Sequence, residues 1–206
     1  FGERIYSIKK FNFDYFSLNG SSQLIAKTGY SRIGGFEIYL SRPELGSSLW
    51  ETILEAGRSE NIRPGSPNII DRVEAGLLSF GNEMTVENTP LECNMDKFLD
   101  INKEADYIGK KVLQRQIRYG IKRRIRGVIY NGPKLPTISR PLQVFDVDKR
   151  TIVGSLTSGA FSPHFKRNIG VGMIKYGYWD NNKKILVNIA DQEFREGLIK
   201  DLPLIQ

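Results

Sequence analysis

The chain has 206 residues, 40% of them hydrophobic and 26% charged, a composition typical of a soluble globular protein with one large or two small domains. No run approaches the roughly 18 consecutive apolar residues of a membrane helix, and no secretory signal pattern opens the sequence. Cys93 is the only cysteine and His164 the only histidine, which excludes an internal disulfide and a Cys/His zinc site. We therefore expect a reducing, cytoplasmic location, and the net charge of +7 indicates an anionic partner without identifying it.

The first residues, Phe1 to Arg4, do not look like an initiator region. The segment through Phe16 mixes Phe, Tyr, Ile and Lys in the manner of an element interior. We therefore expect the chain to begin inside a larger protein.

The first clear elements are predicted to be a pair of strands. Residues 23–28 form an apolar run ended by glycine, and residues 35–40 alternate in the manner of a strand. The glycine-flanked loop between them brings Tyr30 and Glu37 to one end of a sheet, where an aromatic face and a carboxylate can meet a flat heterocycle. Taken one at a time, both residues are also typical of a solvated surface.

Two helices are predicted next. Ser41 followed by Glu44 is a capping box, and apolar residues at helical spacing continue to Gly57. A second helix is capped by Asn68 and is predicted to continue until Gly81. Its apolar face consists of Ile69, Ile70, Val73, Leu77 and Leu78.

A third helix is predicted from Asp106 or Gly109 to about Tyr119. Its inward residues are expected to be Val112, Leu113, Gln116 and Ile117. From residue 123 onward the chain is predicted to form short strands divided by turn residues, which suits a small barrel or sandwich. The predicted strands are residues 125–130, 142–146, 151–157, 170–175, 184–189 and 194–198. A domain boundary near residues 120–123 follows.

The segment with the most information is residues 27–39, Lys-Thr-Gly-Tyr-Ser-Arg-Ile-Gly-Gly-Phe-Glu-Ile-Tyr. It resembles the signature of the glycine cleavage system T-protein family of folate-dependent one-carbon transferases, and the spacing from Tyr30 to Glu37 is kept. Further blocks similar to the family follow in order at residues 71–83, 89–92, 107–110 and 154–163. Because these blocks cover nearly all of the chain, it is identified as a member of the family.

The resemblance implies an α+β fold that is the C-terminal part of a three-lobed ring with folate in its centre. Residues 1–120 would form part of the folate-binding region, an α/β lobe, and residues 121–206 would form a small antiparallel C-terminal β-barrel domain. The catalytic Asp of the family lies upstream of the matched blocks. Catalytic residues are therefore expected upstream of Phe1, and it is doubtful that this chain catalyses the reaction alone.

The resemblance also implies tetrahydrofolate as the cofactor, with no metal. Glu37 would accept hydrogen bonds from N3 and the 2-amino group of the pterin, a two-donor edge that suits a carboxylate. Tyr30 would pack beside the pterin or the benzoyl part, and Arg72 lies at the position of an arginine that faces the same pocket. An alternative for Arg72 is a charge on a helix surface. Residues 32–34, Arg-Ile-Gly, depart from the Gly-Glu-Asp of the family loop, and Phe80 stands where the family often has Tyr.

A branch within the family is indicated by residues 92–98, Glu-Cys-Asn-Met-Asp-Lys-Phe. This stretch lacks the Trp of glycine cleavage T-proteins and looks more like dimethylsulfoniopropionate demethylase. The resemblance implies a methyl or aminomethyl transferase that takes its one-carbon group from a small-molecule donor such as a methylated sulfonium or amine, and positions donor and acceptor in line. Cys93 could be a nucleophile, but a lone cysteine here is more typical of a small buried hydrophobe.

Two other functions remain open from the sequence. A protein of the same family could bind folate without catalysing transfer. A cluster of basic residues interleaved with Tyr119 and free of acidic residues also fits an RNA-binding module, although a helix with basic residues on its solvated side is commonplace and is the favoured explanation. The cluster consists of Lys110, Lys111, Arg115, Arg118, Lys122, Arg123, Arg124 and Arg126.

Overall fold

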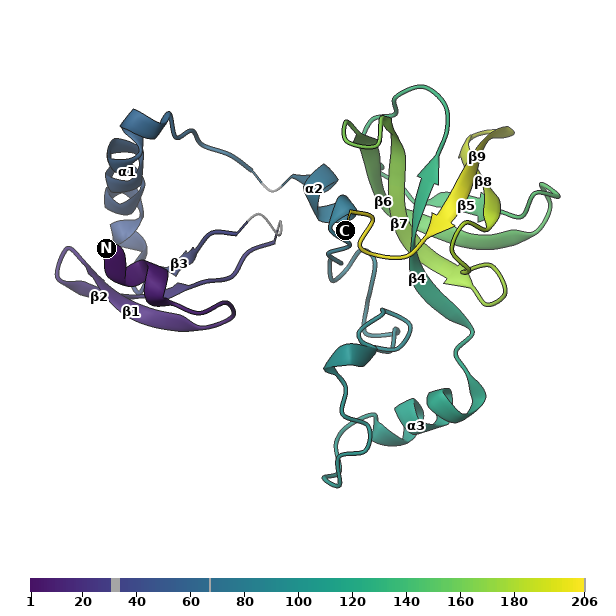
Figure 1. The fold of residues 1–206 in the computed structure, drawn as a ribbon, viewed down its shortest axis with the longest axis horizontal. Coiled ribbons are helices and arrows are strands. Elements are labelled where there is room, and N and C mark those ends of the chain that lie inside the picture. The colour runs from purple at the N-terminus through teal and green to yellow at the C-terminus, as the bar shows by residue number, and fades with distance from the viewer. Residues whose placement is uncertain (31–33, 67, 206) are drawn as a thin grey trace. The chain divides into compact units, whose positions relative to one another are not determined.

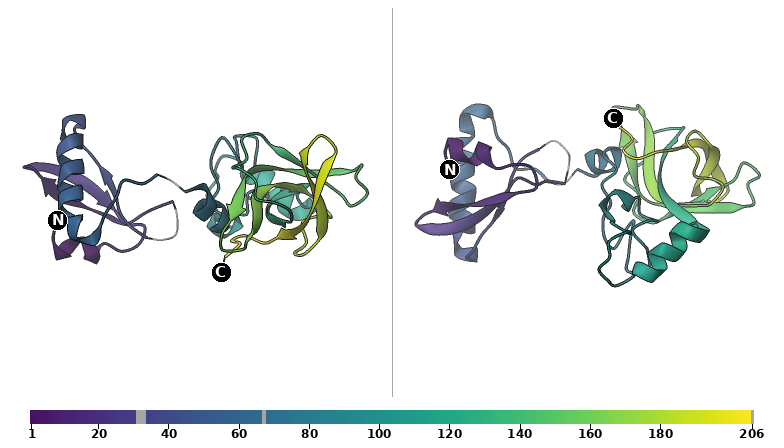
Figure 2. Two further views of the ribbon diagram at one scale, coloured as in Figure 1. Left: turned by 90° about the horizontal axis from the view of Figure 1, so that it is seen from above. Right: turned by 60° about the horizontal axis from the view of Figure 1, so that its bottom comes forward.

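The structure, a computed structural model, describes residues 1–30, 34–66 and 68–205 (Figures 1 and 2). The chain divides into two compact units, Phe1–Asn68 and Ile69–Gln206. Each unit has its own sheet and its own apolar core. Within the described residues, none of the helices combines the length and the apolar character that crossing a membrane requires.

The first unit is built on an antiparallel sheet in the order β1-β2-β3. Its strands are β1 (Phe13–Leu18), β2 (Ser21–Ala26) and β3 (Glu37–Tyr39). Asn19 and Gly20 join β1 to β2 and both have positive φ, which is the conformation that an Asn-Gly hairpin turn favours. The antiparallel pairing of β2 with β3 confirms the predicted strand pair. Residues 31–33 of its loop lie outside the described residues.

Alternation along these strands gives the sheet two different faces. One face is buried, and the core of the unit is formed by Ile8, Phe16 and Ile25. The other face carries Phe13, Tyr15 and Tyr39, and each of these side chains is more than half exposed. Ala26 pairs with Phe13 of β1 on one side and with Glu37 of β3 on the other. Directly paired residues lie on the same face of a sheet, so Glu37 lies on this second face.

The first helix, α1 (Gly46–Ala56), ends at Gly57 as predicted but begins later than predicted. A 3-10 turn, Pro43–Leu45, precedes it, so the prediction that Ser41 caps the helix is wrong. The backbone N–H of Ser41 instead donates to Oε1 of Gln23, at 2.7 Å. Gln23 is fully buried in β2, and this bond holds residue 41 against the sheet before the helix can begin.

The second helix, α2 (Ile69–Glu74), is shorter than the predicted helix, which was to continue until Gly81. The chain leaves the helix at Gly76, which has a φ of 66°. A Cβ at this position would lie 3.0 Å from the Cβ of Leu202, and the carbonyl of Glu74 accepts a hydrogen bond from the N–H of Leu204. The helix therefore ends where the C-terminal segment packs against it.

The third helix, α3 (Lys110–Tyr119), has the predicted bounds. Of its expected inward residues only Leu113 is buried, because Val112 and Ile117 are 54% and 57% exposed. The expectation of a broad buried face on this helix is therefore wrong.

The six predicted strands of the C-terminal region are present and close into a barrel in the order β4-β7-β6-β5-β8-β9. They are β4 (Arg123–Tyr130), β5 (Leu142–Phe145), β6 (Ile152–Ser162), β7 (Arg167–Lys175), β8 (Lys184–Ala190) and β9 (Glu193–Lys200). Strand β6 is longer than predicted because it pairs with both β5 and β7, with a register shift between Leu156 and Ser158. The α+β fold with a small antiparallel barrel is confirmed.

The helix α2 packs on this barrel. Val73 is fully buried in one apolar cluster with Ile125, Ile169 and Val171. The hydroxyl of Ser162 also donates to Oε1 of Glu74, at 2.5 Å. These contacts make residues 69–76 part of the barrel unit. The predicted assignment of residues 1–120 to a folate-binding region and of residues 121–206 to a barrel domain stays a prediction.

Candidate functional site

The predicted pterin acceptor, Glu37, lies at the first position of β3. Its side chain is exposed, and the hydroxyl of Thr28 donates a hydrogen bond to Oε2 of Glu37. Tyr30, two residues beyond Thr28, is 46% exposed. We call Thr28, Tyr30 and Glu37 the hairpin site. It offers a carboxylate with two acceptor oxygens and an accessible aromatic ring on the same hairpin.

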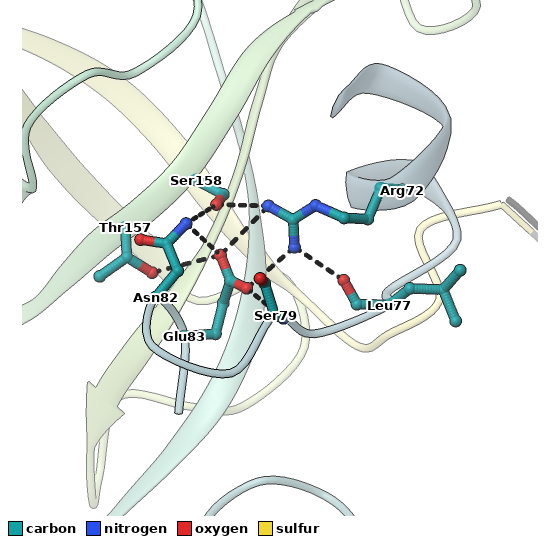
Figure 3. A network of polar contacts seen from close by, with 7 residues as sticks. All are labelled: Arg72, Leu77, Ser79, Asn82, Glu83, Thr157 and Ser158. Carbon is teal, nitrogen blue, oxygen red and sulfur yellow. Dashed lines mark hydrogen bonds and ion pairs between the residues drawn. The ribbon is translucent and has the colours of Figure 1, made fainter. Parts of the chain in front are cut away.

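The third predicted site residue, Arg72, lies in the second unit, in α2. It is 7% exposed, so the alternative of a charge on a helix surface is wrong. Its guanidinium meets Glu83 through two hydrogen bonds, Nη1 to Oε2 at 2.8 Å and Nη2 to Oε1 at 3.3 Å. Nη1 also donates to the carbonyl of Leu77 at 2.8 Å, and Nη2 donates to Oγ of Ser158 at 2.5 Å (Figure 3).

Glu83 is the counter-ion at the centre of this cluster, and its side chain is 0% exposed. Besides Arg72 it receives hydrogen bonds from the backbone N–H of Ser79 at 2.6 Å and from Nδ2 of Asn82 at 3.2 Å. The hydroxyl of Thr157 donates to it at 3.5 Å. A buried ion pair is stable only when such bonds replace the lost water. We call Arg72, Leu77, Ser79, Asn82, Glu83, Thr157 and Ser158 the Arg72 network.

The Arg72 network ties three parts of the second unit together. Asn82 donates through Nδ2 to Oγ of Ser158 at 2.6 Å, in parallel with the bond from Arg72 (Figure 3). Ser158 belongs to β6, so the bond from Arg72 joins α2 to the barrel and the bond from Asn82 joins the residues after α2 to it. Because both terminal nitrogens of Arg72 are bonded to protein oxygens, the network holds the guanidinium in one orientation. Its assignment as a cofactor-binding residue stays a prediction.

No role was predicted for Glu83, Asn82 or Ser158 from the sequence. All three fall within segments that resemble the family, residues 71–83 and 154–163. The resemblance of these two segments to the family could therefore have pointed to the three residues. The sequence of one segment, however, does not show which side chains of the other segment it contacts. The structure supplies that pairing across 86 residues of sequence.

Cys93 is buried and is 4% exposed. Burial raises the pKa of its thiol, the charge of Glu92 raises it further, and Arg123 opposes both effects. A nucleophilic cysteine needs the opposite environment, one that stabilises the thiolate. The structure therefore favours the interpretation of Cys93 as a small buried hydrophobe.

Part of the basic cluster is neutralised within the chain. Arg123 pairs with Glu92 at 3.0 Å, and Arg124 pairs with Asp96 at 2.9 Å. Nε of Arg126 donates to the carbonyl of Trp179 at 2.7 Å. In the described parts of the chain, no group of three or more His, Cys, Asp and Glu side chains could hold a metal ion.

Two protein-family models match the chain. The family model described as the GCVT N-terminal domain matches residues 5–103, and that of the glycine cleavage T-protein C-terminal barrel domain matches residues 123–202. The chain belongs to the glycine cleavage T-protein family. The two models together match most of the sequence, including the hairpin site and the Arg72 network.

Curated relatives of this T-protein family member include a demethylase and aminomethyltransferases. It is 41% identical to the dimethylsulfoniopropionate demethylase DmdA of Ruegeria pomeroyi over 179 residues, 87% of this chain and 48% of that protein. It is 34% identical to the aminomethyltransferase of a Geobacillus species over 196 residues, 94% of this chain and 52% of that protein. For the aminomethyltransferase of Caldanaerobacter subterraneus the identity is 36% over 200 residues, 96% and 52% of the two chains.

A solved structure shows the same fold. The glycine cleavage system aminomethyltransferase T from Bartonella henselae superposes with a TM-score of 0.80 at 20% identity, over 97% of this chain and 54% of that chain. The chain thus spans about half the length of the relatives it matches. These relatives are transferases and a demethylase, and they lend no support to an RNA-binding or a non-catalytic role.

Proposed function

We propose that this chain is part of a tetrahydrofolate-dependent one-carbon transferase. The observation that carries the proposal is the hairpin site, where Glu37 presents an exposed carboxylate at the start of β3 within the segment that resembles the family signature. A carboxylate with two oxygens fits the paired N–H donors of a pterin edge. The two family models and the transferase relatives support the same reaction class.

In this proposal the chain binds and orients the folate. Glu37 accepts the two pterin N–H groups, and Tyr30 packs its ring against the pterin or the benzoyl part. Tetrahydrofolate supplies N5 as the acceptor of the one-carbon group. Arg72 is proposed as a further cofactor-binding residue, and its place in the motif of residues 71–83 supports the assignment.

We further propose that the donor is a small methylated sulfonium or amine. The 41% identity to a dimethylsulfoniopropionate demethylase, against 34% and 36% to aminomethyltransferases, supports this branch. Transfer from a sulfonium breaks one S–CH3 bond, leaves the electron pair on sulfur as a thioether, and forms an N–CH3 bond as N5 loses its proton. Such a displacement depends chiefly on holding the donor, the methyl group and the acceptor in line. No catalytic residue is assigned within this chain.

Replacing Glu37 tests the folate site. Glu37→Gln converts one acceptor oxygen into a donor and leaves a pterin N–H facing an N–H, which costs about 1–3 kcal/mol of binding free energy. We expect isothermal titration with tetrahydrofolate to show affinity reduced by about five- to 150-fold.

Glu51→Gln is the matched control, because Glu51 is exposed on α1 and lies outside the hairpin site. It should bind tetrahydrofolate as the wild-type chain does. Equal affinities for the wild-type, Glu37→Gln and Glu51→Gln proteins would refute the proposed folate site.

A further inference from the structure

The register of β2 and β3 determines which side chains accompany Glu37. Leu24 pairs with Tyr39, and Ala26 pairs with Glu37, the first residue of β3. Thr28 lies two residues beyond the end of β2. Its hydroxyl donates to Oε2 of the carboxylate.

The neighbouring cation is directed to the other face of the hairpin. Nζ of Lys27 lies 5.8 Å from the centroid of the Phe36 ring, and Phe36 packs against the core of the first unit. Thr28 is a neutral donor, so its bond to Glu37 orients the carboxylate without neutralising the negative charge. A carboxylate has about four lone-pair sites, and one hydroxyl occupies one of them.

We propose that Thr28 is a positioning residue that holds the Glu37 carboxylate in its ligand-binding orientation. The inference rests on the proposed role of Glu37 in folate binding. An exposed glutamate otherwise samples several rotamers, and fixing one of them before binding reduces the entropy that binding must remove. Thr28 thereby raises affinity without touching the ligand.

A double-mutant cycle tests this role in the full chain. Thr28→Val removes the hydroxyl at nearly constant shape, and we expect it to weaken tetrahydrofolate binding about two- to tenfold, the effect of one lost hydrogen bond. Thr28→Ser keeps the donor and should bind within about twofold of wild type. In the Glu37→Gln background, adding Thr28→Val should change affinity little, because the carboxylate that Thr28 orients is already gone.

Equal effects of Thr28→Val in both backgrounds, or an equal loss with Thr28→Ser, would overturn the inference while leaving the folate site intact. An unchanged affinity in Glu37→Gln would instead overturn the proposed function. A measurement without ligand tests the positioning role of Thr28 separately from folate binding. NMR three-bond couplings of the Glu37 side chain should report one dominant rotamer in wild type and Thr28→Ser, and rotamer averaging in Thr28→Val. Averaged couplings in the wild-type chain would also overturn the inference.

Discussion

At Glu83, five hydrogen bonds converge on one carboxylate whose side chain is wholly buried. Two of the donors belong to Arg72, so the ion pair is bidentate and has a defined direction. The other three come from Ser79, Asn82 and Thr157. Removing the charge of Glu83 would leave a buried guanidinium without its counter-ion, which is the costly way to disrupt such a pair.

We expect Glu83→Gln to lower the free energy of unfolding by about 3 kcal/mol, because the shape is kept and the compensating charge is lost. Urea unfolding followed by circular dichroism measures the change. Glu87→Gln is the control, since Glu87 is exposed and close in sequence, and it should change stability by less than about 0.5 kcal/mol. A Glu83→Gln protein as stable as the control would show that the pair does not hold the second unit together.

Some residue roles could be predicted from the sequence and others could not. A role for Glu37 could be predicted from the sequence because the motif of residues 27–39, which resembles the family signature, is local. That role stays a prediction. The partner of Arg72 could not be assigned, because hydrogen bonding across 86 residues depends on where β6 lies in the closed barrel. Local sequence patterns predict the secondary structure of a segment, whereas tertiary packing determines which side chains of distant segments contact each other.

At the scale of elements, predictions from strand alternation and turn residues were the most accurate. All six barrel strands were located, since alternating burial and turn residues are local properties. The predicted helix bounds at Ser41 and at Gly81 were wrong because tertiary contacts determine where these helices begin and end. Gln23 holds the backbone at Ser41, and the contact of Gly76 with Leu202 ends α2 early.

Tyr130 makes the barrel sensitive to high pH. It is 1% exposed in β4 and belongs to the barrel core. Burial raises the pKa of Tyr130 to about 12, with Arg195 opposing the shift. Because the folded-state pKa lies above the unfolded value of about 10, the unfolded chain loses this proton first. The stabilisation is therefore complete below about pH 10 and is lost as the pH rises toward 12.

We expect Tyr130→Phe to flatten the loss of stability between about pH 10 and 12. Urea midpoints measured across this range should fall less steeply than in the wild-type chain. Tyr176→Phe is the matched control, because Tyr176 is 71% exposed, and it should follow the wild-type curve. Identical slopes for all three proteins would show that Tyr130 does not resist ionisation in the barrel.

At the scale of the whole molecule, family membership could be predicted because the resemblance extends through five ordered blocks along the chain. The donor could not be fixed in the same way. The chain spans about half the length of its relatives, and the reaction needs residues that recognise the donor as well as those that hold folate. Under the proposed function, substrate choice therefore depends on more residues than those that hold folate.

We expect the full-length protein to move a methyl group from a small sulfonium or a methylated amine to tetrahydrofolate, and not to accept a lipoyl-bound aminomethyl group. The reason is the composition of residues 92–98, which lack the Trp expected of a glycine cleavage T-protein. A cationic donor is best held against aromatic rings, so those rings must come from elsewhere in the protein. Parallel assays with dimethylsulfoniopropionate, dimethylglycine and an aminomethyl-lipoyl carrier measure the preference. Turnover of the lipoyl carrier alone would place the protein in the aminomethyltransferase branch.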